Sequence, residues 1–255
     1  MTLTIDIGNT NIVLGCFDGD AILFRERIST NHTATDLEYA VSIKTALEMY
    51  RLNPENITGA IVSSVVPSVT NTFRRAIEKL CGVKPLVVGP GIKTGLSIRI
   101  DNPAQLGSDL VVDAVAGIHE YPEPQIIIDM GTATTMTVLD PNGAHLGGCV
   151  CPGVKISLEA LTGNTSLLPG IQLDSPKQAL GRNTADAMRS GIMFGTASML
   201  DGMIDRFRAE TGWDFTIVAT GGLAKRIVPL CHNEIVYDRH LIIKGLARLY
   251  RDNAR

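Results

Sequence analysis

The feature that most restricts the possible folds of this chain is a short motif that occurs twice. The first copy contains Asp6 and Gly8, and the second contains Asp129 and Gly131. The two aspartates are 123 residues apart, and the two glycines keep that offset. Each aspartate follows a run rich in β-branched apolar residues, which is typical of a buried strand. Because the chain has 255 residues, a repeat at this offset predicts two similar half-domains of nearly equal size.

Both copies resemble the tip of a β-hairpin. A second β-prone run follows each motif, and Asp18-Gly19 or Asn142-Gly143 then turns the chain again. Each tip combines a carboxylate, a glycine and several hydroxyl or amide side chains. Backbone N–H groups and hydroxyls can bind phosphate oxygens, and a carboxylate can bind a cation. One such motif is common in ordinary turns, whereas two copies in the same setting indicate two loops that face one polyphosphate ligand.

The rest of the chain alternates between helices and strands. Thr35 can cap a helix that runs to about residue 52, with Leu37, Val41 and Leu47 at helical spacing. A long helix is predicted for residues 184–209. The order of these elements predicts an α/β fold in which mixed sheets are flanked by helices.

A third strand end in the second half carries a pair of glycines. Residues 216–220 form an apolar run that leads into Gly221 and Gly222. With no side chains at these two positions, the backbone can lie flat against a nucleoside. The sequence therefore predicts a nucleoside contact beside the second phosphate loop.

Composition limits the class of protein and its partners. Hydrophobic residues make up 45% and charged residues 19%, which is ordinary for a globular protein, and the formal net charge is −3. The negative charge argues against broad binding to nucleic acid or anionic membranes. No apolar run approaches about 20 residues and the N-terminus lacks a signal-peptide pattern, so we expect no membrane span. Five scattered cysteines are expected to be free thiols in a reducing cytosol.

The proline-containing break at residues 121–124 lies just before the second motif. We therefore expect two domains, residues 1–118 and residues 119–255. Asp109 belongs to the first of them and directly precedes a largely apolar stretch, residues 111–118, which is predicted to be a buried helix. A carboxylate at a helix start can simply stabilise the helix dipole, or it can do chemistry. The spacing does not separate these two interpretations.

The two loops and the glycine pair resemble the superfamily of acetate and sugar kinases, heat-shock chaperones and actin. A more specific set of motifs covers nearly the whole chain and consists of residues 6–11, Asn102-Pro103, residues 107–109, residues 129–132, Pro152-Gly153 and residues 181–184. Together these motifs resemble type III pantothenate kinase.

This resemblance implies two duplicated ribonuclease-H-like domains with an ATP cleft between them. It implies transfer of the γ-phosphate of ATP to the primary hydroxyl of pantothenate, which gives 4'-phosphopantothenate in the first step of coenzyme A biosynthesis. The family's cofactors would be Mg²⁺ and a monovalent cation, K⁺ or NH₄⁺. The family also implies a cytoplasmic homodimer whose small-molecule partners are ATP and pantothenate.

Residue roles follow from the same resemblance, position by position. The ATP contacts are Asp6, Ile7, Gly8, Asn9, Thr10, Asn11, Ile12 and Val13 in the first loop, with Thr132, Gly221 and Gly222 in the second half. The pantothenate contacts are Gly107, Ser108, Asp109, Leu110 and Thr184, with Asp109 as the proton acceptor. Asp129 would bind the monovalent cation, and Asp6 is a candidate ligand of Mg²⁺.

The chain departs from the family pattern at one of these positions. Leu110 stands where the family commonly has arginine, so a nearby cation would have to come from Arg99 or Arg182. Two other functions remain open at this stage. They are a regulatory, transcription-accessory protein that only holds nucleotide, and a kinase for another small hydroxyl substrate. Consumption of ATP upon addition of pantothenate distinguishes the three.

Overall fold

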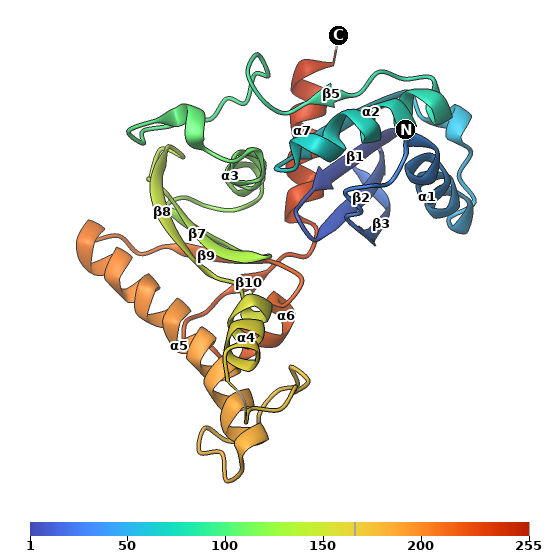
Figure 1. Ribbon diagram of the computed structural model, residues 1–255. Helices are drawn as coiled ribbons and strands as arrows, with labels where there is room; N and C mark the ends of the chain where they lie inside the picture. Colours follow the sequence, from blue (N-terminus) through green and yellow to red (C-terminus); the bar gives the residue numbers. More distant parts are fainter. Residues whose placement is uncertain (166, 255) are drawn as a thin grey trace. The chain divides into compact units, whose positions relative to one another are not determined.

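The computed structural model describes residues 1–165 and 167–254 as an α/β protein with two compact units (Figure 1). Unit 1 comprises Met1–Leu96, Asn102–His119 and His240–Arg255, and unit 2 comprises Ser97–Asp101 and Glu120–Arg239. Each unit contains one five-stranded mixed sheet with helices packed on it. The expected fold class is therefore confirmed.

The sheet of unit 1 has the strand order β3-β2-β1-β4-β5. Its strands are β1 (Thr2–Ile7), β2 (Asn11–Asp18), β3 (Ala21–Ser29), β4 (Gly59–Ser64) and β5 (Leu86–Val87). The first three strands form an antiparallel meander, and β4 and β5 run parallel to β1. The carboxyl ends of β1, β4 and β5 therefore lie at one edge of the sheet.

The sheet of unit 2 repeats this arrangement with the order β10-β9-β6-β7-β8. Its strands are β6 (Gln125–Met130), β7 (Ala133–Leu139), β8 (His145–Pro152), β9 (Thr216–Gly221) and β10 (Val236–Tyr237). Here β6, β7 and β8 are antiparallel, and β9 and β10 run parallel to β6. Asp6 and Asp129 are each the second-last residue of the central strand, as the sequence repeat predicted.

Helices cover both faces of the unit 1 sheet. They are α1 (Asp36–Met49), α2 (Pro67–Cys81), α3 (Ser108–Glu120) and α7 (Leu241–Asn253), with the short 3-10 helices η1 (Pro54–Asn56) and η2 (Pro103–Gln105). One core joins α1 and α2 to β1, and a second core joins α3 and α7 to the other face. In unit 2, the helices α4 (Val154–Gly163), α5 (Thr184–Thr211) and α6 (Ala224–Ile227) and the 3-10 helix η3 (Val228–Leu230) share one core with the sheet.

Local signals explain how helix α1 begins and which side it buries. Thr35 and Glu38 form a reciprocal capping box at its start. The buried side carries Tyr39 and Ile43, whereas Leu37 and Val41 are 59% and 54% exposed. Leu37 and Val41 therefore keep the helical spacing expected of them but lie on the exposed side of the helix.

The two units do not follow the expected boundary between residues 118 and 119. Helix α7 belongs to unit 1, where it packs against β1, β2 and β4 (Figure 1). A Cβ atom at Gly245 would collide with the backbone of Val112 in α3, so a glycine is required for this close packing. Residues 97–101 join unit 2 because Ser97 O and Arg99 N both hydrogen-bond to the backbone of His145, at 2.8 Å each.

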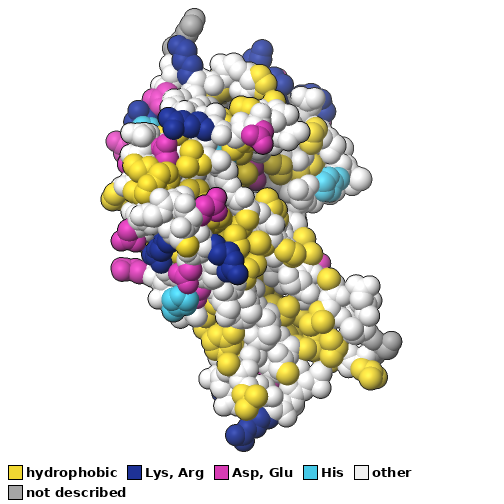
Figure 2. Space-filling view, turned by 90° about the vertical axis from the view of Figure 1, so that its left-hand side faces the viewer, with side chains coloured by type: hydrophobic (Ala, Val, Ile, Leu, Met, Phe, Trp, Pro, Cys, Tyr) yellow, Lys and Arg dark blue, Asp and Glu magenta, His cyan; other side chains and the backbone are white. Residues whose placement is uncertain are grey.

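The surface shows mixed charge. On the face in Figure 2, lysine and arginine side chains lie among aspartate and glutamate side chains, with apolar residues exposed between them. Across residues 1–165 and 167–254, no helix combines the length and apolar character needed to cross a bilayer. All five cysteines are free, as expected.

Candidate active site

The loop between β1 and β2 is a tight turn held by backbone contacts. Gly8 N donates a hydrogen bond to Asn11 O at 3.0 Å. From the end of β3, Thr30 N donates to Thr10 O at 3.0 Å and Thr30 Oγ1 donates to Gly8 O at 2.6 Å. Asn9 and Thr10 are exposed at the tip. The loop is thus fixed in shape and presents polar side chains to solvent.

The apolar residues of this loop have a different place. Ile7 and Ile12 are fully buried and Val13 packs against the second core. Only the backbone of Ile7 and Ile12 can therefore contact a ligand. Of residues 6–13, the side chains of Asp6, Asn9, Thr10 and Asn11 are the polar ones that the loop offers.

Asp109 lies in the first turn of α3, where its Oδ1 accepts a hydrogen bond from Leu110 N at 2.9 Å. A Cβ atom at Gly107 would collide with that same Oδ1 atom. The carboxylate is therefore folded back over the start of the helix, in space that only a glycine at position 107 leaves open. Leu110 is half-buried beside it.

Ser108 ties this helix start to β4. Its Oγ lies 3.0 Å from Ser63 Oγ, accepts Ser64 N at 3.2 Å and donates to Ser64 O at 3.1 Å. Ser63 is paired in register with Asp6 on the neighbouring parallel strand. Within unit 1, Asp6, the β1–β2 loop and Asp109 therefore lie at the same edge of one sheet.

In unit 2, Asp129 lies in a row of oxygen-bearing side chains. It is paired in register with Thr135 on β7 and with Thr220 on β9. Residues paired in this way point to the same face of a sheet, so one carboxylate and two hydroxyls lie side by side. Thr135 Oγ1 is buried and has no hydrogen-bond partner among the described residues. Such a set of oxygens suits a cation with oxygen ligands.

The candidate phosphate loop of unit 2, between β6 and β7, lies next to several glycines. Gly131 and Thr132 are exposed, and a Cβ at Gly153 would collide with the Thr132 carbonyl. Gly221 has a φ of 96° and is paired with Met130, whose backbone leaves no room for a side chain there. The structure thus brings Thr132 and Gly221 to the same end of the unit 2 sheet.

Thr184 is exposed at the start of α5, directly after the N-cap residue Asn183. The Asn183 side chain accepts Asp186 N at 2.9 Å, which explains why the helix begins here. The geometry of unit 2 assigns no ligand to Thr184, so its role stays a prediction.

Arg99 does not supply a free cation in place of the arginine that Leu110 replaces. Its Nη1 atom lies 3.1 Å from Oδ2 of Asp140, a carboxylate that is only 4% exposed. Asp140 also accepts Asn142 N and Ala144 N and closes the β7–β8 turn. This turn lies at the end of the sheet opposite Asp129, because β6 and β7 are antiparallel. Arg182 remains exposed just before α5.

Sequence reasoning left Ser63, Ser64 and Thr70 out of the site. Thr70 Oγ1 donates to Ser64 Oγ at 2.8 Å, and the backbone N and O of Ser64 join this pair to the contact between Ser108 and Ser63. The available signal was a pair of serines at the end of an otherwise apolar strand.

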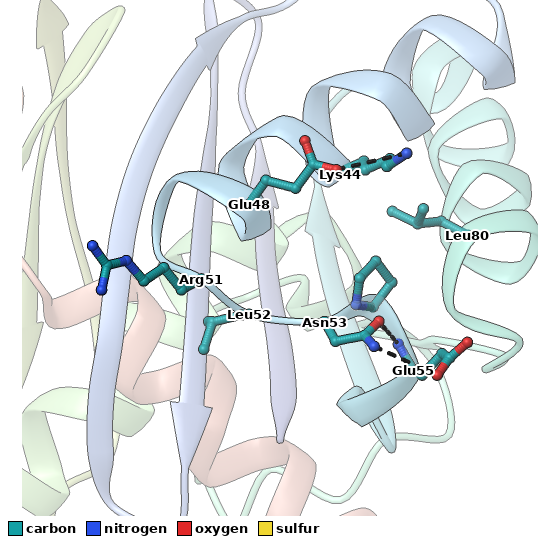
Figure 3. Close-up of a pocket in the computed structure, with 8 residues that line it drawn as sticks. Lys44, Glu48, Arg51, Leu52, Asn53, Glu55 and Leu80 are labelled. Carbon is teal, nitrogen blue, oxygen red and sulfur yellow. Dashed lines mark hydrogen bonds and ion pairs between the residues drawn. The ribbon is translucent and has the colours of Figure 1, made fainter.

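Two other polar features lie away from these strand ends. A surface hollow next to the end of α1 is lined by Lys44, Glu48 and Asn53 among others (Figure 3). It adjoins η1, which leads into the start of β4, so it lies at the opposite edge of the sheet from Ser63. Its Lys44–Glu48 pair spans 3.6 Å with both side chains more than half exposed, and such pairs contribute little.

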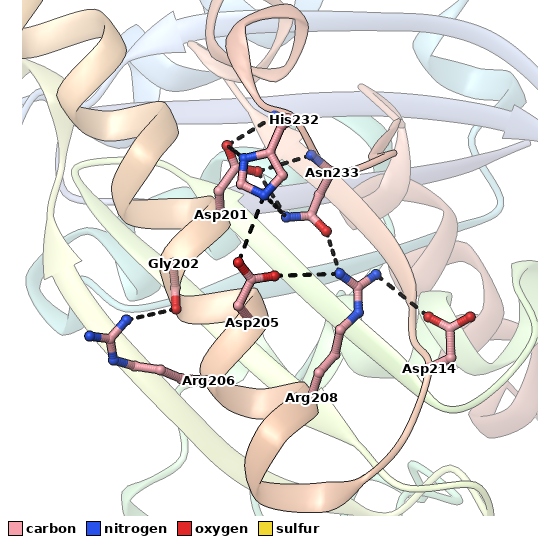
Figure 4. A network of polar contacts seen from close by, with 8 residues as sticks. All are labelled: Asp201, Gly202, Asp205, Arg206, Arg208, Asp214, His232 and Asn233. Atoms are coloured by element: carbon pink, nitrogen blue, oxygen red, sulfur yellow. Dashed lines mark hydrogen bonds and ion pairs between the residues drawn. The ribbon is translucent and has the colours of Figure 1, made fainter.

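The second feature joins α5 to the segment before β10 (Figure 4). Asp201 accepts hydrogen bonds from His232 N at 3.0 Å and Asn233 N at 3.1 Å, and His232 Nδ1 lies 2.9 Å from its Oδ2. Burial alone would raise the pKa of Asp201, but these hydrogen bonds and the charge of His232 lower the pKa below its usual value. The network is a structural clamp within unit 2.

Comparisons with known proteins give consistent results. The family model for type III pantothenate kinase matches residues 2–206. A curated type III pantothenate kinase from an Exiguobacterium species is 42% identical over 255 residues, which is 100% of both chains. Two solved structures share the fold at lower identity. A Campylobacter jejuni protein assigned to the Baf family of transcriptional activators has a TM-score of 0.60 at 18% identity and covers 98% of each chain. The activator of 2-hydroxyisocaproyl-CoA dehydratase from Clostridium difficile, with bound ADPNP, has a TM-score of 0.57 at 15% identity and covers 99% of this chain and 94% of that one.

Proposed function

This chain belongs to the type III pantothenate kinase family and phosphorylates pantothenate with ATP, and we propose that its Asp109 carboxylate accepts the proton of the substrate hydroxyl. The reaction phosphorylates the primary hydroxyl of pantothenate and gives 4'-phosphopantothenate in coenzyme A biosynthesis. Family membership favours this activity over a nucleotide-holding regulator or a kinase for another substrate.

One observation carries the role of Asp109. The bonds between Ser108 and β4 hold the first turn of α3 at the carboxyl edge of the sheet that also ends in Asp6. Since Leu110 N already binds Oδ1, we assign the incoming proton to Oδ2. Phosphoryl transfer depends mostly on position and charge, so a carboxylate near the phosphate loop is sufficient as a proton acceptor.

We assign the β1–β2 loop to the phosphates of ATP. Asn9 and Thr10 offer exposed polar groups there, and the bonds from Thr30 hold the loop in one shape. A loop held by bonds of this kind loses little conformational entropy upon binding. Thr132 and the Gly221–Gly222 pair would make the corresponding contacts from unit 2, and Thr184 would contact pantothenate.

The oxygen atoms at the strand ends fit the expected cations. Asp129 with the hydroxyls of Thr135 and Thr220 would hold a monovalent cation, and Asp6 would hold Mg²⁺ together with phosphate oxygens. No cluster of three His, Cys, Asp or Glu side chains suited to a metal occurs in the part of the chain that the structure describes. Mg²⁺ is usually bound through one or two carboxylates together with phosphates. Bound cations would offset the negative charge on the transferred phosphoryl group.

Release of ADP upon addition of pantothenate tests the activity, and Asp109→Asn tests the residue. We expect this variant to fold and bind ATP but to lose about 100-fold or more in kcat, the usual scale for loss of a general base. Asp18→Asn is the matched control, since Asp18 is exposed at the end of β2 opposite Asn11. Asp113, one turn along α3, would be a poor control because it is only 2% exposed. Equal rates for Asp109→Asn and the wild type would reduce Asp109 to a helix-start charge.

The proposal also covers the oligomeric state of the protein and its location in the cell. A cytoplasmic homodimer is expected from the family, and α5 is the candidate for the shared surface. It carries Gly191 and Gly195 on its exposed side, where an added Cβ would meet nothing within 4 Å in the chain itself.

A further inference from the structure

We propose that Ser63 is a positioning residue for phosphoryl transfer, because its hydroxyl holds the first turn of α3 and thereby the Asp109 carboxylate. The inference rests on the proposed role of Asp109 and adds a residue that acts on it from the neighbouring strand. Ser63 is fully buried, so it acts through Ser108 and does not touch the substrate.

The position of Ser63 links the two halves of the unit 1 site. It is the second-last residue of β4 and is paired in register with Asp6 of β1. The two strands are parallel, so both side chains point to the same face of the sheet. This face is the one that α3 and α7 cover, as the core around Ile61 and Val112 shows.

The direction of the Ser63–Ser108 hydrogen bond follows from the partners of Ser108. Ser108 Oγ donates its single proton to the carbonyl oxygen of Ser64, at 3.1 Å. Ser64 N can only donate, so Ser108 Oγ accepts that bond, at 3.2 Å. A hydroxyl has one proton and two acceptor sites. With that proton on Ser64 O, Ser63 is the donor in the 3.0 Å contact, and the Ser108 hydroxyl is then saturated.

A saturated hydroxyl leaves the start of α3 little freedom to rotate. The Ser64 end of the network is itself held, because Ser64 Oγ accepts Val66 N at 3.1 Å and Thr70 Oγ1 at 2.8 Å. Asp109 is the residue after Ser108, so its carboxylate moves with that turn. Removal of the Ser63 hydroxyl loosens this link without altering the backbone or the phosphate loop.

The expected consequence is a fall in kcat with little change in ATP affinity. A displacement of about 1 Å at a reacting group can cost up to about 100-fold in rate, so a single lost positioning bond is expected to cost about tenfold. We expect the KM for ATP to stay within about twofold of the wild-type value. Ser63 is buried away from the ligand, so its loss should not weaken binding of ATP in the ground state.

The experiment is a double-mutant cycle with Ser63→Ala, Ser108→Ala and both together, assayed by pantothenate-dependent ADP release. Ser63→Cys is added because a thiol is a weaker donor of similar shape. Ser42→Ala on the exposed side of α1 removes a hydroxyl bonded to its own helix, Ser42 Oγ to Glu38 O, and is the matched control. Thermal unfolding of every variant is measured in parallel, and rates are taken well below each midpoint. Asp109→Asn is assayed beside them.

We expect kcat to decrease from serine to cysteine to alanine at position 63. We also expect Ser63→Ala to have no further effect on kcat when Ser108 is already alanine. Additive losses in the cycle would overturn the proposal, as would a kcat that tracks only the unfolding midpoint. An active Ser63→Ala variant beside an inactive Asp109→Asn variant would refute the role of Ser63 and leave the proposed function intact. An active Asp109→Asn variant would instead refute the assigned role of Asp109, and with it this inference.

Discussion

The carboxylate of Asp109 occupies the space where a side chain at Gly107 would have to lie. This relationship explains why a glycine precedes the catalytic candidate by two residues. Gly107 has no positive φ, so the requirement is for space and not for an unusual backbone.

Gly107→Ala should therefore displace the Asp109 carboxylate while the backbone of α3 stays in place. We expect kcat to fall by about tenfold or more, since small displacements at a reacting group carry large rate penalties. Steady-state kinetics and thermal unfolding provide the measurement. Gly163→Ala is a control for the added methyl, because a Cβ there meets nothing within 4 Å. A fully active Gly107→Ala enzyme would contradict this account of the glycine.

Activity should depend on a small monovalent cation bound at Asp129. Replacement of potassium by a large organic cation should suppress turnover strongly, because such a cation cannot approach a carboxylate and hydroxyls closely. Full turnover in the absence of potassium and ammonium would contradict a cation site at Asp129.

Thr135→Val tests the contribution of the hydroxyl beside Asp129. Thr135 Oγ1 is buried without a partner among the described residues, so its replacement by a methyl should not destabilise the fold. We expect a higher potassium concentration for half-maximal activity and an unchanged or higher unfolding midpoint. A potassium titration that matches the wild type would show that Thr135 is not a ligand.

The clamp around Asp201 should stabilise unit 2 only when that carboxylate is ionised. The folded-state pKa of Asp201 is lowered, so its contribution is present above the unfolded pKa of about 3.9 and is lost as the pH falls through the folded value. Asp201→Asn should therefore be less stable than the wild type at pH 7, with a difference that shrinks below about pH 4. Denaturant unfolding across this range measures it.

Asp205→Asn is the matched comparison for this clamp. Asp205 lies 3.7 Å from His232 Nε2 and 3.7 Å from Arg208 Nη1 and is 57% exposed, so its ion pairs should contribute little at any pH. Equal pH profiles for the two variants would argue against the buried carboxylate as the source of the effect.

A homodimer should be measurable by light scattering at micromolar concentration. If α5 forms the shared surface, Gly195→Arg should shift the protein toward monomer without loss of fold, because the chain itself leaves open space at this position. Gly212→Ala would be unsuitable as a control, since its φ of 72° disfavours any side chain. A monomer for the wild type would remove the prediction, and an unchanged dimer for Gly195→Arg would move the interface elsewhere.

The sequence by itself determined the two sheets and the positions of Asp6 and Asp129 at equivalent strand ends. Runs of β-branched residues and glycine-containing turns act through short-range sterics, so they specify strands and hairpins locally. The capping box at Thr35 and the αL glycine Gly82 after α2 determine helix ends for the same reason.

Tertiary packing alone decided the surroundings of Asp109, the placement of α7 and the exposed side of α1. Ser108 and Ser63 are 45 residues apart, and only the packing of α3 on the unit 1 sheet brings their hydroxyls to 3.0 Å. Leu37 and Val41 satisfy a helical spacing, but the sheet meets the side of the helix that carries Tyr39 and Ile43. Such choices depend on the energy of contacts between distant segments, and the local periodicity of a sequence does not encode that energy.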